Sequence, residues 1–383
     1  MEKQKICIIG GGLTGLVTAI VLSKLNCKID LVTGSFNKSA KSNKTIAISE
    51  NNFDFLKKQN ISQSLKKEAW PCSAMKLYTE TKNQKFSKIF ELDNKKKQKK
   101  ILYMLENSKI MKLMMNKIKQ IKSISVKNHD KIYEISTSGI LKSVKFNNNN
   151  SKYNLVILCT GNNSSIVKNI FDDQIIENSY GESAITTILN HNPLKNNTAR
   201  QIFFTNEILA LLPISNTKTS IVWSIKKDIY KKNDFLLKKK IKFYTKNFLK
   251  NITFTKSIEH YDLNLLIRKK YYKDRVLLFG DALHRVHPFT GQGFNMILRD
   301  LANLENTLKN KIALGLDIGS GDVLSEFLQA TKPRNLAYLL AINFIKSFFS
   351  IQEKNFKSLR NKIITNLNKN NIAKDFFHGV VIK

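Results

Sequence analysis

The residues best suited to chemistry lie in Val276–Asp300, which reads VLLFGDALHRVHPFTGQGFNMILRD. The apolar run Val276–Phe279 predicts a buried strand, and Asp281 follows it directly. A carboxylate at the end of a buried strand can bind a ribose or ribityl hydroxyl. Gly291 and Gly293 then open a helix, expected from about Phe294 to Leu304, whose amino end favours a negatively charged group. This segment therefore predicts half of a nucleotide site.

A second glycine-rich turn lies near the amino terminus, within KICIIGGGLTGL. Gly10 permits a tight turn, Gly12 lets the backbone approach a pyrophosphate, and Gly15 lets the next helix pack closely on the strand. Leu13 and Thr14 belong to the same turn, and the helix is expected to run to about residue 26. Two nucleotide-handling segments, one near each end of the folded chain, indicate a flavoprotein.

The second strand, predicted at Lys28–Val32, departs from the usual pattern of such sites. An Asp or Glu normally ends this strand and accepts hydrogen bonds from a ribose, but here the position is held by Thr33. Asp30 lies in the strand, out of register. A neutral hydroxyl forms a hydrogen bond weaker by about 1 kcal/mol than one to a charged group. We therefore assign Thr33 to the cofactor site as a weaker ligand.

Two histidines, His284 and His287, lie in the predicted loop after Asp281. Their spacing on a loop, with no acid or thiol beside them in the sequence, does not favour a metal site, and none is expected. Residues that position a flavin or substrate, or histidines with a purely structural role, both fit. We select His287 and Pro288 as the candidates that face the reacting centre.

The order of elements predicts an α/β fold with an interrupted first domain. Residues 5–32 read as a βαβ unit of a doubly wound sheet, and Tyr153–Cys159 as another buried parallel strand. Residues 183–225 read as four antiparallel strands of a second sheet, and residues 322–383 as mostly helical. We predict three parts: residues 1–74 with 101–180 and 270–321, residues 75–100 with 181–269, and residues 322–383.

Composition adds weaker constraints. Lys+Arg number 64 and Asp+Glu 29 among 383 residues, for a net charge of +35, while 42% of residues are hydrophobic. Lysines are spread throughout, so a solvated surface explains them, and an anionic membrane surface is the main functional alternative. We expect no nucleic-acid partner. Four scattered cysteines and a first strand close to Met1 favour a reducing cytoplasm and no secretory signal, and no apolar run is long enough to span a bilayer.

Together these segments resemble the FAD-dependent aromatic-ring monooxygenases, and specifically the ubiquinone-biosynthesis hydroxylases among them. GDALHRVHPFTGQGFN is similar to the second FAD motif of that family nearly throughout. Further similar segments are KTIAIS (Lys44–Ser49), YMLEN (Tyr103–Asn107), LALLPIS (Leu209–Ser215) and SIVWS (Ser220–Ser224). The resemblance covers almost the whole chain. It implies a p-hydroxybenzoate hydroxylase-like fold: a Rossmann-like FAD-binding domain, an inserted antiparallel-sheet substrate domain, and C-terminal helices.

The resemblance also implies roles for individual residues. Asp281 would bind the ribityl or pyrophosphate region, and the carbonyl of Pro288 would lie near the reacting face. The glycine turn would hold the FAD pyrophosphate, and the isoalloxazine would lie against a set comprising Gly291, Gln292, Gly293, Phe294 and Asn295. This chain departs from the family pattern at three places. The family has Arg at the position of Lys44, which we place at the cofactor. It has Ala-Asp-Gly at the position of Cys159-Thr160-Gly161, and Arg at the position of Lys168.

By this resemblance the protein would use NAD(P)H and O₂ to hydroxylate the aromatic ring of a polyprenyl phenol in ubiquinone biosynthesis. Apolar sheet residues within 202–204 and 209–214 would shelter the tail or simply form core. A peripheral position at the inner membrane surface and membership of a quinone-biosynthesis complex are further expectations. Two alternatives stay open: a non-catalytic flavoprotein-like scaffold, motivated by Thr33 and Thr160, and another FAD oxidoreductase such as a prenyl reductase.

Overall fold

The computed structural model describes most of the chain. The described residues are 3–34, 42–80, 86–93, 100–128, 132–146, 149–161, 164–171, 175–227, 233–286, 291 and 293–350.

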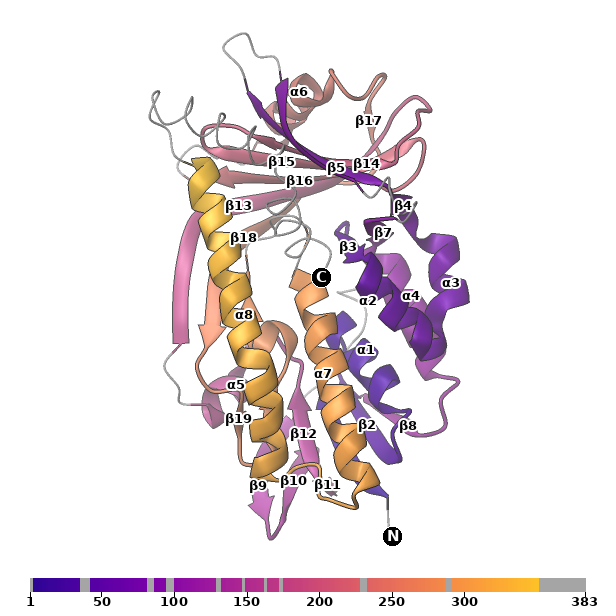
Figure 1. Cartoon of the computed structure of the whole chain (residues 1–383), viewed down its shortest axis with the longest axis vertical. Coiled ribbons are helices and arrows are strands. Elements are labelled where there is room, and N and C mark those ends of the chain that lie inside the picture. Colours follow the sequence, from indigo (N-terminus) through magenta and orange to yellow (C-terminus); the bar gives the residue numbers. More distant parts are fainter. Residues whose placement is uncertain are drawn as a thin grey trace.

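A six-stranded sheet forms the lower part of the molecule in Figure 1. Its order is β19 (Tyr272–Lys273), β20 (Val276–Leu278), β12 (Leu155–Leu158), β1 (Gln4–Ile9), β2 (Cys27–Thr33) and β8 (Ile124–Asn128). All neighbours pair in parallel except β19 with β20. The central strands are continuous apolar runs because both faces of the sheet are covered. Helix α1 (Leu13–Leu22) packs against β1 and β2, and strands β10 (Leu141–Phe146) and β11 (Asn149–Tyr153), of a small antiparallel sheet, contact β12 and β1. The prediction of an α/β fold with a parallel, Rossmann-like sheet is confirmed.

Helix α1 (Leu13–Leu22) follows β1 and is shorter than expected. The prediction that it runs to about residue 26 is wrong, because the chain turns after Leu22 to bring Cys27 into β2. The Cys27 amide donates to the carbonyl of Leu25 in this turn.

Smaller elements surround this sheet. Helices α2 (Glu50–Leu56), α3 (Ser62–Glu68), α4 (Asn107–Ile118) and α5 (Ser165–Ile170) belong to this part, with a π-helical segment at Lys57–Ile61. One three-stranded sheet has the order β3 (Thr45–Ser49), β7 (Leu102–Glu106) and β4 (Trp70–Cys72). Another has the order β11 (Asn149–Tyr153), β10 (Leu141–Phe146) and β9 (Ile132–Ser138).

A nine-stranded sheet forms the upper part of the molecule. It contains β21 (His284–Arg285), β18 (Glu259–Arg268), β13 (Ile175–Asn190), β16 (Lys218–Lys226), β15 (Glu207–Pro213), β14 (Thr198–Phe203), β5 (Ala74–Glu80), β6 (Phe86–Asp93) and β17 (Thr253–Phe254). The four antiparallel strands predicted within 183–225 are confirmed. The first of them begins earlier, at Ile175, because β18 pairs with its extension. The predicted domain boundaries stay a prediction.

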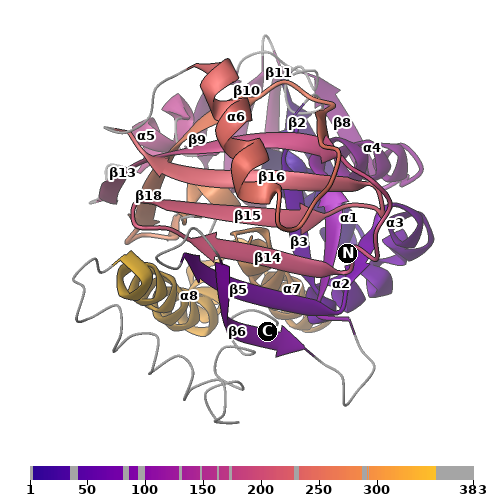
Figure 2. The ribbon, with the colours of Figure 1, turned by 90° about the horizontal axis from the view of Figure 1, so that it is seen from above.

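The two faces of the nine-stranded sheet pack against different parts of the molecule. Helix α6 (Asp234–Thr245) lies across one face, as Figure 2 shows, and packs on a cluster that includes Leu209, Leu211 and Trp223. The alternate residues of the same strands point to the opposite face, since side chains alternate along a strand. Ala210 and Leu212 therefore face the interior between the two large sheets. Only this second set is placed to shelter a tail.

Two long helices, α7 (Gly293–Ala313) and α8 (Gly321–Ser350), run side by side along the lower part of the molecule, and the upper end of α8 reaches the nine-stranded sheet (Figure 1). Helix α7 extends beyond the predicted end at Leu304 because Thr307 and Leu308 continue its buried face. The predicted helical character of the C-terminal region holds to Ser350, and residues 351–383 lie outside the described part.

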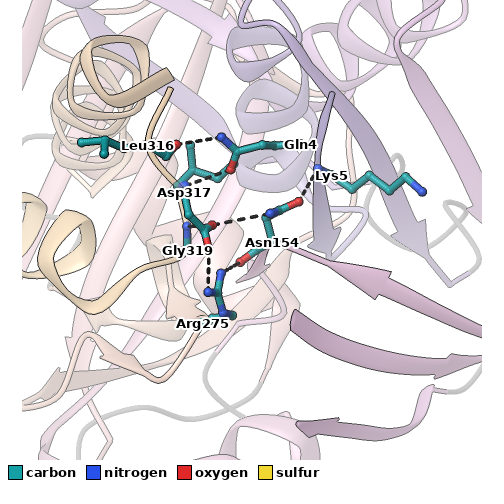
Figure 3. A network of polar contacts seen from close by, with 8 residues as sticks. Gln4, Lys5, Asn154, Arg275, Leu316, Asp317 and Gly319 are labelled. Atoms are coloured by element: carbon teal, nitrogen blue, oxygen red, sulfur yellow. Dashed lines mark hydrogen bonds and ion pairs between the residues drawn. The ribbon is translucent and has the colours of Figure 1, made fainter. Parts of the chain in front are cut away.

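A polar network closes the amino end of the parallel sheet (Figure 3). Asp317, between α7 and α8, accepts hydrogen bonds from Arg275 Nη2 at 2.6 Å and from the Gly319 amide at 3.0 Å. Asn154 accepts from the Lys5 amide at 2.9 Å, and Gln4 donates to the Leu316 carbonyl at 2.8 Å. These bonds tie β1, β12 and β20 to the connection between the two helices.

Candidate functional site

The two glycine segments predicted from the sequence lie against each other. A Cβ added to Gly280, whose φ is +66°, would lie 2.6 Å from Cγ2 of Thr14. A Cβ at Gly10 would lie 2.4 Å from the carbonyl oxygen of Cys159, and one at Gly15 would lie 1.9 Å from that of Gly10. Contacts this short leave no room for a side chain. The glycines therefore let β1, α1, β12 and the loop after β20 meet at one point.

A cavity of about 690 Å³ opens at this point, beyond the carboxyl ends of the parallel strands. Its lining residues include Gly12, Thr14 and Asp281, together with Gly291 and Phe294. The cavity is large enough for a cofactor. Open α/β sheets bind their ligands at this edge.

The walls of the cavity fit a nucleotide. Among the described atoms, nothing lies within 4 Å of a Cβ built on Gly12, and no side chain caps α1 there. The free amides of this helix start can donate to phosphate oxygens. The buried hydroxyls of Thr45, Thr160 and Thr186 also line the cavity and have no hydrogen-bond partner within the described structure. Buried polar groups are rarely left unpaired, so these hydroxyls are placed to meet a ligand.

Charged groups gather at one side of the cavity. Desolvation lowers the pKa of Lys44, while Asp281 opposes this shift and Arg285 adds to it. The Lys44 ammonium lies 3.8 Å from the centre of the Tyr261 ring. Burial and a hydrogen bond to Glu259 raise the pKa of Tyr261 to about 12, so its hydroxyl keeps its proton at neutral pH. Lys44 thus lines the cavity beside a neutral phenol.

A smaller cavity, of about 60 Å³, adjoins the first and shares Thr45, Val222 and Gly291 with it. It extends between the nine-stranded sheet and the sheet that contains β3 and β7. Its lining residues are mostly apolar and include Met75, Leu102, Met104, Ala199, Ala210 and Leu212, with Gln201 and Arg200 as the larger polar ones. This is an apolar extension of the large cavity.

Several predicted residues line the large cavity, and others do not. Gly10, Gly12, Leu13, Thr14, Lys44, Asp281, Gly291, Gly293 and Phe294 all line it. Thr33 does not: it is 1% exposed, and its hydroxyl donates to Asn128 Oδ1 at 3.0 Å within the sheet. Thr33 therefore does not reach this cavity, and its assignment to the cofactor stays a prediction. Gly15 lies behind the wall and supports it through its contact with Gly10.

Asn295 also differs from the expectation. Its side chain is 3% exposed, donates to the Ala47 carbonyl at 2.8 Å and accepts from the Ser49 amide at 2.8 Å. These bonds tie the start of α7 to β3 and leave the amide pointing away from the cavity. Asn295 therefore positions the Gly293 end of the helix and does not line the cavity itself.

Of the two histidines considered for a positioning or a structural role, only His284 lies in the described part of the chain. Its Nε2 lies 3.0 Å from Oδ2 of the buried Asp300, which also accepts from Asn335 at 2.8 Å. His284 is therefore a structural histidine whose ring also contributes to the cavity wall. The catalytic candidates His287 and Pro288, and the cofactor candidate Gln292, lie outside the described residues.

The residues of the nine-stranded sheet that cover the cavity, here called its roof, were not predicted from the sequence. Ala184, Val222, Tyr261 and Leu263 come from three strands of the nine-stranded sheet and line the same space. None of these residues belongs to a recognisable sequence motif, and only the pairing of the strands brings them together. The one available signal was the small side chain of Ala184 and the hydroxyl of Tyr261, within strands that are otherwise rich in larger apolar residues.

Solved structures share this fold. The p-nitrophenol 4-monooxygenase PnpA of Pseudomonas putida aligns over 100% of this chain and 99% of its own, with TM-score 0.77 and 15% identity. Klebsiella pneumoniae HpxO, solved in complex with FAD and uric acid, aligns over 99% of this chain and 97% of its own, with TM-score 0.77 and 13% identity. The p-hydroxybenzoate hydroxylase-like fold prediction is confirmed.

Sequence relatives give the same result. The mitochondrial ubiquinone biosynthesis monooxygenase COQ6 of Dictyostelium discoideum is 25% identical and covers 98% of this chain and 90% of its own. The ubiquinone hydroxylase UbiL of Rhodospirillum rubrum is 29% identical over 45% of this chain and 41% of its own. A model described as "FAD binding domain" matches residues 3–313. The chain belongs to this FAD-binding family and is an FAD-dependent monooxygenase.

Proposed function

We propose that this monooxygenase hydroxylates the aromatic ring of a polyprenyl phenol in ubiquinone biosynthesis, with NAD(P)H as reductant and O₂ as oxidant. The observation that carries the proposal is the apolar extension next to Gly291, which gives a hydrophobic substrate a place beside the flavin cavity. The relatives named for ubiquinone biosynthesis support the same substrate class.

The residues of the chain have distinct tasks in this proposal. The backbone amides at the start of α1, next to Gly12, would hold the pyrophosphate, and the carboxylate of Asp281 would accept hydrogen bonds from ribityl hydroxyls. The amino end of α7, at Gly293, stabilises negative charge on the flavin ring. When bound, FAD would supply the chemistry of hydride acceptance from NAD(P)H and of reaction with O₂. Val222 and its neighbours in the sheet cover the reacting ring and exclude water.

The test combines a spectrum with isotope labelling. Purified protein loaded with FAD is mixed with NAD(P)H and a short-chain 3-prenylphenol under ¹⁸O₂. We expect phenol-stimulated NAD(P)H oxidation and a product that carries one ¹⁸O atom. Colourless protein that cannot take up FAD would favour the scaffold alternative. FAD-loaded protein that reduces the prenyl chain without consuming O₂ would favour the reductase alternative.

We also propose that the protein associates with the cytoplasmic face of the inner membrane through α6. Phe235, Leu236 and Phe243 are 75%, 49% and 40% exposed on this helix. Exposed lysines lie among and beyond them, at positions 239, 242, 246 and 250. Apolar side chains that insert and lysines that meet anionic headgroups are the two parts of peripheral binding. None of the described helices is long and apolar enough to cross a bilayer.

Vesicle cosedimentation tests the membrane proposal. Binding to vesicles that contain phosphatidylglycerol should exceed binding to neutral phosphatidylcholine vesicles, and it should weaken with added salt. Phe235→Ser should reduce binding, whereas Ile140→Ser, at a residue 79% exposed elsewhere, should not. Equal binding to both kinds of vesicle, or none, would contradict the proposal.

A further inference from the structure

A buried glutamine in the small apolar cavity has a polar atom that the protein does not use. Gln201 is 3% exposed and lines this cavity, and its Oε1 has no hydrogen-bond partner among the described residues. Leaving such an acceptor buried and unpaired is costly to stability. Its retention here calls for a ligand.

The strand alternation fixes the direction in which Gln201 points. In β14 the side chain of Ile202 packs under α6, and the Arg200 guanidinium lies 5.6 Å from the centre of the Phe248 ring on that same side. Ala199 and Phe203 belong to the opposite cluster. Gln201 lies two residues from each of them along the strand, so its side chain points to the same face and its amide faces the interior between the sheets.

Strand register places Gln201 near the flavin cavity. Gln201 pairs with Ala210 of β15, and Ala210 pairs with Val222 of β16, which lines both cavities. Two strand spacings amount to about 10 Å. The intervening residue is an alanine, which leaves space above the sheet. An aromatic ring bound against Val222 therefore extends over Ala210 toward the Gln201 amide.

The surroundings define the group that Gln201 can bind. Among the described residues, Arg200 is the one charged residue that lines the small cavity, but its guanidinium lies over the Phe248 ring on the α6 side of the sheet. The other unpaired polar atom of this cavity, in the part of the chain that the structure describes, is Oγ1 of Thr45, at the boundary shared with the large cavity. A carboxylate or phosphate has no cation to meet there. A neutral hydroxyl does fit, because it can donate a hydrogen bond to the free Oε1.

We propose that Gln201 is a substrate-binding residue that accepts a hydrogen bond from a hydroxyl group on the substrate ring and so fixes which ring carbon faces the flavin. This inference rests on the proposed function and adds the residue that sets ring orientation. A site built around a buried hydrogen-bonding group discriminates strongly against a ligand that lacks the matching group.

The test compares Gln201→Leu with the wild type on two probes, 3-prenylphenol and prenylbenzene, which differ by one hydroxyl. Binding to the FAD-loaded protein is followed by the change in flavin absorbance. We expect the variant to bind the phenol about 5- to 10-fold more weakly and to bind prenylbenzene at least as well as the wild type. The product per NAD(P)H oxidised should fall, because a ring that is free to rotate is hydroxylated less often. Thermal unfolding of the unliganded variant should be unchanged or higher.

Gln59→Leu is the matched control. Gln59 is 4% exposed and also has an unpaired Oε1, but it contacts Glu305 and does not line either cavity. This variant should leave phenol binding and the product yield unchanged.

The outcomes separate the two proposals. If wild-type protein forms ¹⁸O product and Gln201→Leu lowers affinity for both probes equally, or for neither, the role of Gln201 is refuted while the function stands. If the wild type binds the phenol more tightly than prenylbenzene, Gln201→Leu abolishes this preference, and no product forms from either protein, the hydroxylase function fails while the binding role holds.

Discussion

The two ends of the parallel sheet are built in opposite ways. At the amino end, Asp317, Arg275 and Asn154 satisfy one another and the adjoining backbone with hydrogen bonds. At the carboxyl end, the hydroxyls of Thr45 and Thr160 lack partners within the described structure, and space is open in front of Gly12. The first end is complete without a ligand, and the second is not.

This difference separates glycines that serve the fold from those that serve a ligand. A Cβ on Gly319 would lie 1.8 Å from the carbonyl oxygen of Asn154, whereas one on Gly12 would meet no described atom within 4 Å. Both positions are glycine in the sequence. The structure predicts that only Gly319 is required for folding and only Gly12 for the cofactor.

The largest expected effect comes from substituting these two glycines. Gly319→Ala should lower the free energy of unfolding by about 3 kcal/mol, because the methyl group collides with backbone. Gly12→Val should leave the stability of the FAD-free protein unchanged but weaken FAD binding by about 100-fold or more, since its side chain fills the phosphate position. Denaturant unfolding and FAD titration measure the pair. A loss of stability in Gly12→Val, or a loss of FAD affinity in folded Gly319→Ala, would contradict the separation of the two glycines into a cofactor role and a folding role.

Asp281→Ala should weaken FAD binding by about 10- to 100-fold, because it removes a charged acceptor worth about 1.5–3 kcal/mol. The carboxylate is exposed to the cavity, so the unliganded fold should keep its melting temperature. Fluorescence quenching of added FAD gives the affinity. An unchanged affinity would remove Asp281 from the site.

Asp317→Asn should lower the free energy of unfolding by about 1–2 kcal/mol at neutral pH, through weaker bonds to Arg275. Burial raises the pKa of Asp317, but hydrogen bonds from Arg275 and Gly319 outweigh it and lower the pKa below its ordinary value. A lowered pKa stabilises the folded state above the unfolded pKa, and this stability is lost as pH falls through the folded pKa. The difference between wild type and variant should therefore shrink below about pH 4. A difference independent of pH would contradict this explanation.

Thr160→Val gives the smallest effect. It removes an unpaired hydroxyl, so the unliganded protein should be as stable as the wild type or slightly more so, while FAD binding weakens by about 2- to 10-fold. Calorimetric titration measures the change in affinity. A clear loss of stability without FAD would mean that the hydroxyl already has a partner in the protein.

The sequence predicted the parts of the site that depend on local pattern. The glycine turn at Gly10–Gly15 and the acid at Asp281 both follow buried strands, and a strand that ends at a known place positions its next residue. The sequence did not predict that Thr33 is buried within the sheet. Its side-chain direction depends on the twist of the sheet and on its hydrogen bond to Asn128, which comes from a strand far away in the sequence. The roof residue Tyr261 was missed for the same reason. Gln201 left a faint signal, a polar residue at an apolar position of the alternation.

The most direct test of the central claim is FAD titration into unliganded wild-type protein and Gly12→Val at matched stability. We expect one FAD per chain for the wild type, with the flavin absorption of a bound chromophore, and little or no binding for the variant. Equal FAD binding by the two folded proteins would show that the cofactor does not approach the chain at Gly12, and the assignment of this cavity would be wrong.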